Sequence, residues 1–325
     1  MGRAAAALFV LALAAPGTAS ADPRPVPPGE LSSHWTAPPT VVALAVLAVV
    51  LFAQALVRLR RRGRADLAGA DRVLLFAAGL ALAVLPLVSP LDAVGERYLL
   101  SAHMLQHVLI ADAAPALLVF ALRGPLGFFL LPPSVLRRLA PLRPVLRVLL
   151  RPRVAFAIWL GTIFGWHFPS AYDDALLHPW AHELEHATFV LAGTLAWIQV
   201  VDPARRGHLT RGRRALFAFG MFAFGTAIVE GLLFSRAPAY AVYAAEPHRV
   251  FALSPLLDQR LAAAVMFAEQ ALTVGAALVL LLRPALRSLP SDAAPTVTRL
   301  CDPPPRRRRR SAFFASSAAA RSRRF

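Results

Sequence analysis

The chain has 325 residues, of which 57% are hydrophobic and only 16% charged, and its mean hydropathy is +0.56. Soluble domains are about 45–50% apolar and about 25% charged, so the composition excludes an ordinary soluble protein. All 35 basic residues are arginine. The absence of lysine excludes a retinal protein, because retinal binds to a lysine of a membrane helix through a Schiff base.

Residues 1–21 form a separate unit at the N-terminus. They contain one early arginine, a short apolar core and the small-residue ending Ala19-Ser20-Ala21, which together are the pattern of a secretory signal peptide. The alternative is an uncleaved eighth span. Cleavage leaves residues 22–39 as an extracellular arm rich in proline.

Seven apolar stretches follow, each near the ~20 residues that a helix needs to cross about 30 Å of hydrocarbon. They lie at 41–59, 73–91, 98–120, 154–172, 182–201, 215–234 and 261–282. The sequence therefore predicts an all-α, polytopic membrane helix bundle of seven transmembrane helices over residues 40–283. Gly165 and Pro169 make the fourth span the least regular of the seven.

The arginines predict how the bundle is oriented. Of the 35, 29 fall in the segments 58–72, 122–153, 202–214 and 283–325, and only five in the segments on the other side. Arginine-rich loops stay in the cytoplasm, so the N-terminus is expected outside the membrane and the C-terminus inside. Residues 284–325 are expected to be a disordered Arg/Pro-rich cytoplasmic tail, which holds the single cysteine, Cys301.

The net charge of +17 does not indicate a nucleic-acid partner, because topology accounts for it. The expected partner of the arginine-rich inner loops is anionic lipid. Residues 132–153 mix leucine and valine with arginine, which predicts a helix lying in the inner membrane interface.

Two histidine pairs lie near the predicted outer surface. The third span carries His103 and His107 near its outer end, and the fifth begins with His182 and His186. Residues four apart share one face of a helix, so each pair presents two imidazoles on the same side. Polar groups inside a membrane are costly and are functional candidates by default.

The same layer receives further polar and sulfur-bearing side chains from neighbouring spans. The candidate ligands beyond the two pairs are His167, Met104 and Met266, and the carboxylates expected to orient the imidazoles are Asp173, Glu185, Glu230 and Asp258. Imidazole with thioether suits copper, particularly Cu(I), and imidazole with carboxylate suits zinc. The sequence predicts a copper site, with zinc as the weaker alternative. Interhelical hydrogen bonding of the histidines remains open.

Two other functions stay open from the residues alone. "HELEH" (182–186) satisfies the H-E-x-x-H signature of zinc metalloproteases, with Glu183 as general base. That motif leaves the second histidine pair without a role. A copper permease needs a polar path to the inner face, and Asp112 with Glu269 and Gln270 are the residues deep enough to begin one.

The runs "HMLQHVLIADAAPALLVFALRGP", "PSAYDDALLHPWAHELEHATFVLAGTLAWIQVVDP" and "SPLLDQRLAAAVM" occur in this order. Over residues 40–283 the chain resembles the CtaG family of caa3-type cytochrome c oxidase assembly factors, which are seven-span bacterial plasma-membrane proteins. The resemblance implies a non-enzymatic role in making an active haem–copper oxidase through its copper centres. The implied partners are the subunits of that oxidase.

Overall fold

The computed structural model describes residues 26–205, 207 and 209–287. The predicted signal peptide, Cys301 and residues 288–325 of the predicted tail lie outside the described residues. The chain divides into two compact units, Met1–Pro284 and Ala285–Phe325, and the helix bundle belongs to the first.

Six helices are long and apolar enough to cross a membrane. They are α2 (Pro39–Arg61), α3 (Ala70–Val88), the composite helix formed by α5 (Leu100–Val108), η3 (Leu109–Ala113) and α6 (Ala114–Ala121), α12 (Pro179–Val201), α13 (Arg211–Leu233) and α15 (Pro255–Arg287). A bent pair of segments supplies a seventh span, if the two are counted as one. The described residues contain no strand. The predicted all-α polytopic bundle is confirmed.

The fourth span differs from its prediction. Helix α10 (Pro152–Trp166) ends three residues before α11 (Pro169–Leu177) begins, so the predicted continuous span 154–172 is wrong. The residue before a proline avoids helical backbone angles, and Phe168 is extended at φ −67° and ψ 128°. At 15 residues α10 is about 22 Å long, shorter than the hydrocarbon layer.

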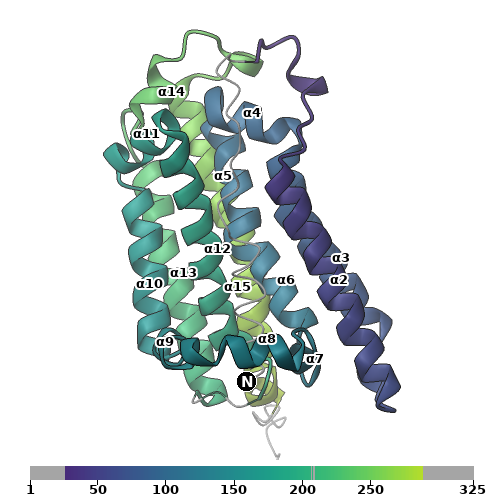
Figure 1. Cartoon of the computed structure of the whole chain (residues 1–325). Helices are drawn as coiled ribbons and strands as arrows, with labels where there is room; N and C mark the ends of the chain where they lie inside the picture. Colours follow the sequence, from purple (N-terminus) through teal and green to yellow (C-terminus); the bar gives the residue numbers. More distant parts are fainter. Residues whose placement is uncertain (1–25, 206, 208, 288–325) are drawn as a thin grey trace, which may run out of the picture. The chain divides into compact units, whose positions relative to one another are not determined.

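The segment before α10 is also more broken than predicted. In place of one interfacial helix over 132–153 there are three short ones, α8 (Pro133–Arg138), η4 (Ala140–Leu142) and α9 (Arg143–Leu149). Prolines stand at the first or second position of each, where a missing N–H costs nothing. Segment Ala140–Leu149 meets α10 at 74°. Figure 1 shows α8 and α9 lying across one end of the helices.

The composite third span contains a π-helical turn, η3, that its apolar pattern did not predict. Pro115 cannot donate to the carbonyl of Ala111, four residues earlier, and its ring crowds that carbonyl. The displaced oxygen is accommodated by α12 at Gly193, where an added Cβ would lie 1.7 Å from it. The wide turn places Asp112 between α12 and α15. There it accepts hydrogen bonds from Trp197 Nε1 and, at 2.8 Å, from Thr273 Oγ1.

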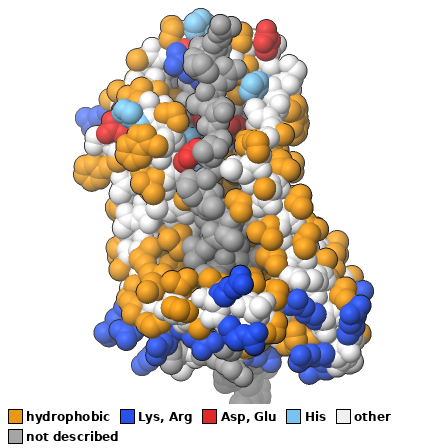
Figure 2. Space-filling model, in the orientation of Figure 1, with side chains coloured by type: hydrophobic (Ala, Val, Ile, Leu, Met, Phe, Trp, Pro, Cys, Tyr) orange, Lys and Arg blue, Asp and Glu red, His pale blue; other side chains and the backbone are white. Residues whose placement is uncertain are grey.

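The bundle has chemically different ends. Most of the described arginines lie at the end near α7 (Leu126–Phe129), α8 and α9, here called the arginine end (Figure 2). The opposite end carries α4 (Pro90–Arg97), α11 and α14 (Ala241–Ala245) and is called the histidine end (Figure 1). Some arginines also close helix termini: Arg214 donates to the carbonyls of Val200 and Val201 at 2.8 Å each.

Candidate metal centre

The two predicted histidine pairs meet near the histidine end. His103 and His107 come from α5 and His182 and His186 from α12, and one ring nitrogen of each lies within 4.8 Å of the others. His103 Nε2 is 3.1 Å from His182 Nε2, and His107 Nε2 is 3.2 Å from His186 Nε2. His103 and His107 are almost completely buried. These four residues are called the four-histidine group.

Two of these spacings match those around a metal ion. Tetrahedral imidazole ligands at a metal–nitrogen distance of about 2.0 Å are roughly 3.3 Å apart, as in the two close pairs, whereas the longest separation in the group, 4.8 Å, would have to shorten on binding. A hydrogen bond between two imidazoles has a similar length, so the distances alone do not distinguish the two arrangements. The groups that contact the other nitrogen of each ring help to distinguish the two arrangements, because they determine which ring nitrogen carries the proton.

His103 is held in one tautomer by two phenols. Its Nδ1 lies 2.8 Å from the hydroxyl of Tyr243 and 2.9 Å from that of Tyr172. The Tyr243 hydroxyl donates its proton to the carbonyl of Gly95 at 2.6 Å, so it accepts from His103 Nδ1–H. Burial holds the pKa of both phenols well above the usual value, so both stay protonated. The Nε2 of His103 therefore presents a lone pair to the group.

His182 is held in the same tautomer by a carboxylate. Its Nδ1 lies 3.2 Å from Oε1 of Glu96 in α4, so Nδ1–H donates to Glu96 and Nε2 is bare. Two bare nitrogens 3.1 Å apart repel one another unless a cation, either a proton or a metal ion, lies between them. Protein metal sites commonly orient histidine ligands through such partners on the second ring nitrogen.

In the second pair, His107 and His186, a carboxylate also lies near one ring, but it is farther away. His107 Nδ1 is 3.8 Å from Oε1 of Glu185, which is too long for a direct hydrogen bond. Glu185 is fully buried, and neither of its carboxylate oxygens has a hydrogen-bond partner among the described residues. A buried carboxylate without hydrogen bonds is costly, so a positive charge near His107 would stabilise this pair.

Two of the carboxylates predicted to orient imidazoles bind backbone amides instead. Asp258 accepts from the amides of Leu100 and Ser101 at 2.7 and 3.1 Å, which fixes the start of α5 one turn before His103. Asp173 accepts from the amides of Ala241 and Val242 at 3.0 and 3.2 Å. Each therefore positions a helix that carries a residue of the site, because α14 bears Tyr243.

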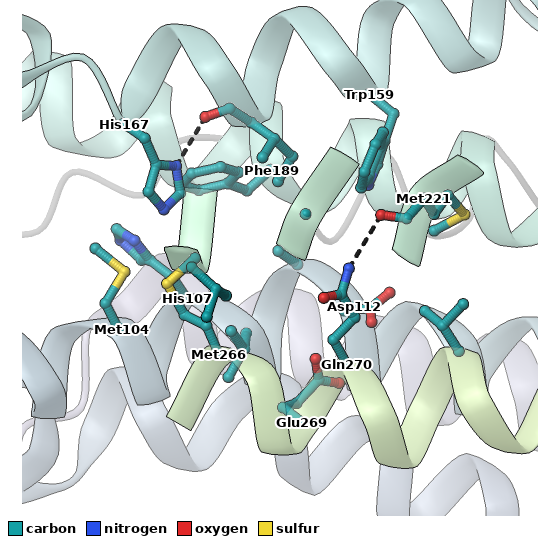
Figure 3. A pocket seen from close by; sticks show the side chains of 16 residues that line it. Met104, His107, Asp112, Trp159, His167, Phe189, Met221, Met266, Glu269 and Gln270 are labelled. Atoms are coloured by element: carbon teal, nitrogen blue, oxygen red, sulfur yellow. Dashed lines mark hydrogen bonds between the residues drawn. The ribbon is translucent and has the colours of Figure 1, made fainter. Parts of the chain in front are cut away.

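The remaining predicted residues fall into two groups. Glu230 is exposed on α13 and lies outside the four-histidine group, so its role as a partner of the imidazoles stays a prediction. His167, Met104 and Met266 lie outside the four-histidine group but line a cavity of about 80 Å³ beside His107. Figure 3 shows these side chains at one end of the cavity, with Glu269 and Gln270 towards the other.

Four residues that matter to the geometry were absent from the predicted site: Glu96, Tyr243, Tyr172 and Gly95. Glu96 and Tyr243 belong to short helices in segments expected to be loops, where no periodic pattern indicates which way a side chain points. Gly95 permits the close packing of α4 on α5, since a Cβ there would lie 2.9 Å from the Cα of His103.

Asp92 in α4 is a further buried carboxyl beside the site. Its Oδ1 accepts from Gln106 Nε2 at 2.5 Å. Burial, together with the charge of Glu96, raises the pKa of Asp92 to about 7. The electrostatic environment of α4 therefore changes near neutral pH.

The fold and site define a class: a multi-pass helical membrane protein with a four-histidine group, two of its rings buried and two partly buried, between two of its helices. The sequence profile of the family described as cytochrome c oxidase caa3 assembly factor (Caa3_CtaG) matches residues 50–288. The chain belongs to this family. No curated protein and no solved structure matched the chain.

Proposed function

We propose that this assembly factor binds copper in the four-histidine group and helps to supply copper to a cytochrome c oxidase. The observation that carries the proposal is the convergence of four imidazoles from two helices, with one ring nitrogen of each within 4.8 Å of the others. Imidazole ligands suit copper and zinc. The family is described as an assembly factor of cytochrome c oxidase, and the resemblance implies that this oxidase is a haem–copper enzyme.

The geometry supports a binding role over a catalytic one. A catalytic zinc site keeps one coordination position open for water or substrate, whereas structural sites are closed. Here His103 and His107 stand opposite the two histidines of the HELEH motif and would complete four ligands. The metalloprotease hypothesis needs a free position that this arrangement does not offer.

A copper permease is also less well supported. The cavity reaches Asp112, Glu269 and Gln270, but beyond the Asp112–Thr273 pair the packing towards the arginine end is mainly apolar. A buried cluster that includes Val119, Ala277 and Leu281 fills the space between the helices there. A permeating ion would have to cross this cluster without polar ligands, at a high cost in free energy.

We place the four-histidine group at the outer face of the membrane, in accordance with the arginine distribution. Copper would then enter from the outside without crossing the hydrocarbon layer. Contact of the arginine end with anionic lipid would anchor the inner face.

The first test is metal analysis of purified full-length protein. We expect wild-type protein to retain copper and the double variant His182→Ala/His186→Ala to retain less copper, because two ligands of the four-histidine group are gone. Glu183→Gln is the matched control, because it changes the HELEH motif but removes no ligand. If Glu183→Gln abolished oxidase assembly as completely as loss of the histidines, the protease hypothesis would be favoured.

A second test follows the oxidase itself. In cells whose only copy is His103→Ala/His107→Ala, the oxidase polypeptides should be inserted but inactive and poor in copper. Excess copper in the medium should restore part of the activity, since mass action can replace delivery. An oxidase with full copper content and normal turnover from these cells would contradict the proposal.

A further inference from the structure

The cavity beside the four-histidine group has an end lined by soft donor atoms. Met104 of α5, Met266 of α15 and His167, which follows α10, line this end together with His107. Figure 3 shows the ring of His167 directed towards the two methionine side chains. The three helices bring two thioethers and an imidazole to one place inside the bundle.

We propose that Met104, Met266 and His167 form a second metal site, selective for Cu(I), next to the four-histidine group. This inference extends the proposed copper function. The site is separate because its thioether ligands are not shared with the first one.

The geometry of His167 gives the strongest support for the second site. Its Nδ1 lies 2.7 Å from the carbonyl of Ile163, an acceptor only, so Nδ1 is the protonated nitrogen. Its Nε2 therefore holds a lone pair. That atom is buried and has no hydrogen-bond partner among the described residues. A buried acceptor without a partner costs free energy, and a ligand in the cavity would remove this cost.

The donor set selects the metal. Thioethers are soft ligands that favour Cu(I), whereas zinc prefers imidazole, thiolate and carboxylate. None of the three proposed ligands carries a negative charge, which agrees with a singly charged ion in an apolar surrounding. The two carboxyl groups that line the cavity, on Asp112 and Glu269, lie towards its other end (Figure 3).

His107 faces both sites, because it belongs to the four-histidine group and also lines the cavity. An ion could therefore move between the sites by exchange of ligands at one shared imidazole. The alternative is that the methionines only pack in the core and that water binds His167; about 80 Å³ is ample for water.

The experiment is a comparison of Cu(I) and Zn(II) stoichiometry in full-length protein purified in detergent. Cu(I) is measured by competition with a chromogenic Cu(I) chelator. Wild-type protein should bind two Cu(I) but one Zn(II). The double variant Met104→Leu/Met266→Leu should bind one Cu(I) and one Zn(II). Met221→Leu is the matched control, since Met221 also lines the cavity but lies beside Trp159 (Figure 3), and it should keep two Cu(I).

The histidine variant separates this proposal from the preceding one. His182→Ala/His186→Ala should lose Zn(II) and keep one Cu(I). If wild-type protein binds a single Cu(I) and the methionine variant is unchanged, the second site does not exist, whatever the result for the four-histidine group. X-ray absorption of wild-type protein loaded with two Cu(I) gives an independent readout. Sulfur scattering supports the proposal, and nitrogen ligands alone overturn it even if the methionine variant fails to fold.

Discussion

At the scale of single residues, the site depends on groups that fix which imidazole nitrogen is protonated. Tyr243 fixes the tautomer of His103, because its hydroxyl donates to the carbonyl of Gly95 and can only accept a hydrogen bond from the ring. Glu96 fixes the tautomer of His182 by accepting a hydrogen bond from Nδ1. The bare nitrogens face inward for this reason, so the metal affinity should depend on residues that never touch the metal.

Tyr243→Phe tests this dependence. Removal of the hydroxyl frees His103 to change tautomer, and loss of such a partner typically weakens metal affinity about 10–100-fold. We expect a weakening in that range, measured by chelator competition, with unchanged stoichiometry. Tyr240→Phe is the control, because the Tyr240 hydroxyl donates to the carbonyl of His167 at 3.3 Å instead. Equal affinity in the two variants would show that Tyr243 does not orient His103.

Asp92 predicts a pH dependence of stability. Its folded pKa is about 7, above the unfolded value of about 3.9, so the folded state loses stability as pH rises through this window. Asp92→Asn keeps an acceptor for Gln106 and removes the charge that burial and Glu96 disfavour. In metal-free protein, Asp92→Asn should melt at a higher temperature than wild type at pH 8, and the difference should shrink at pH 5.5. A difference independent of pH would contradict this origin.

The sequence predicted the four histidines but not the residues that orient them. A spacing of four on an apolar helix shows directly that His103 and His107 share a face. Glu96 and Tyr243 lie in segments without periodicity, so their direction depends on tertiary contacts. Asp173 and Asp258 were placed at the correct end of the bundle, yet a carboxylate near a helix start binds amides as readily as imidazoles, and sequence cannot distinguish the two.

At the scale of elements, the third span is shaped by a proline and a glycine from different helices. Pro115 displaces the carbonyl of Ala111, and Gly193 of α12 leaves the room for it. The apolar runs predicted the other long spans closely, because hydrophobic length alone defines them, except that α15 (Pro255–Arg287) extends well beyond the predicted 261–282 at both ends. They could not predict η3 or the break at Pro169, since both depend on the backbone rather than on hydropathy.

Gly193→Ala should therefore be strongly destabilising, because the new methyl group would overlap the carbonyl oxygen of Ala111. We expect a lower melting temperature in detergent and weaker metal binding, since α12 would move away from α5. Gly161→Ala in α10 is the matched control, with nothing within 4 Å of the new Cβ. It should be neutral or slightly stabilising, as alanine favours helix by about 1 kcal/mol. Equal behaviour of the two variants would contradict the role of Gly193.

At the scale of the whole molecule, the two ends of the bundle should face different compartments. In a Cys301→Ser background, a cysteine at Ala237, an exposed residue between α13 and α14, should react with an impermeant thiol reagent in intact cells. A cysteine at the exposed Ser134 in α8 should react only after the membrane is opened. The reverse pattern would place the four-histidine group on the inner side.

The π-helical turn limits which insertions and deletions the third span can tolerate. A π-helical turn holds one residue more than the α-helical turn that would connect the same two ends. Deletion of one codon within 109–113 should therefore close the turn to a regular α-helix and leave α5 and α6 in nearly the same register. The same deletion within α5 or α6 would rotate the flanking residues by about 100°, so that either the histidines turn away from α12 or α6 loses its packing on α3. Within the third span, η3 is therefore the segment where loss of one residue should be tolerated best.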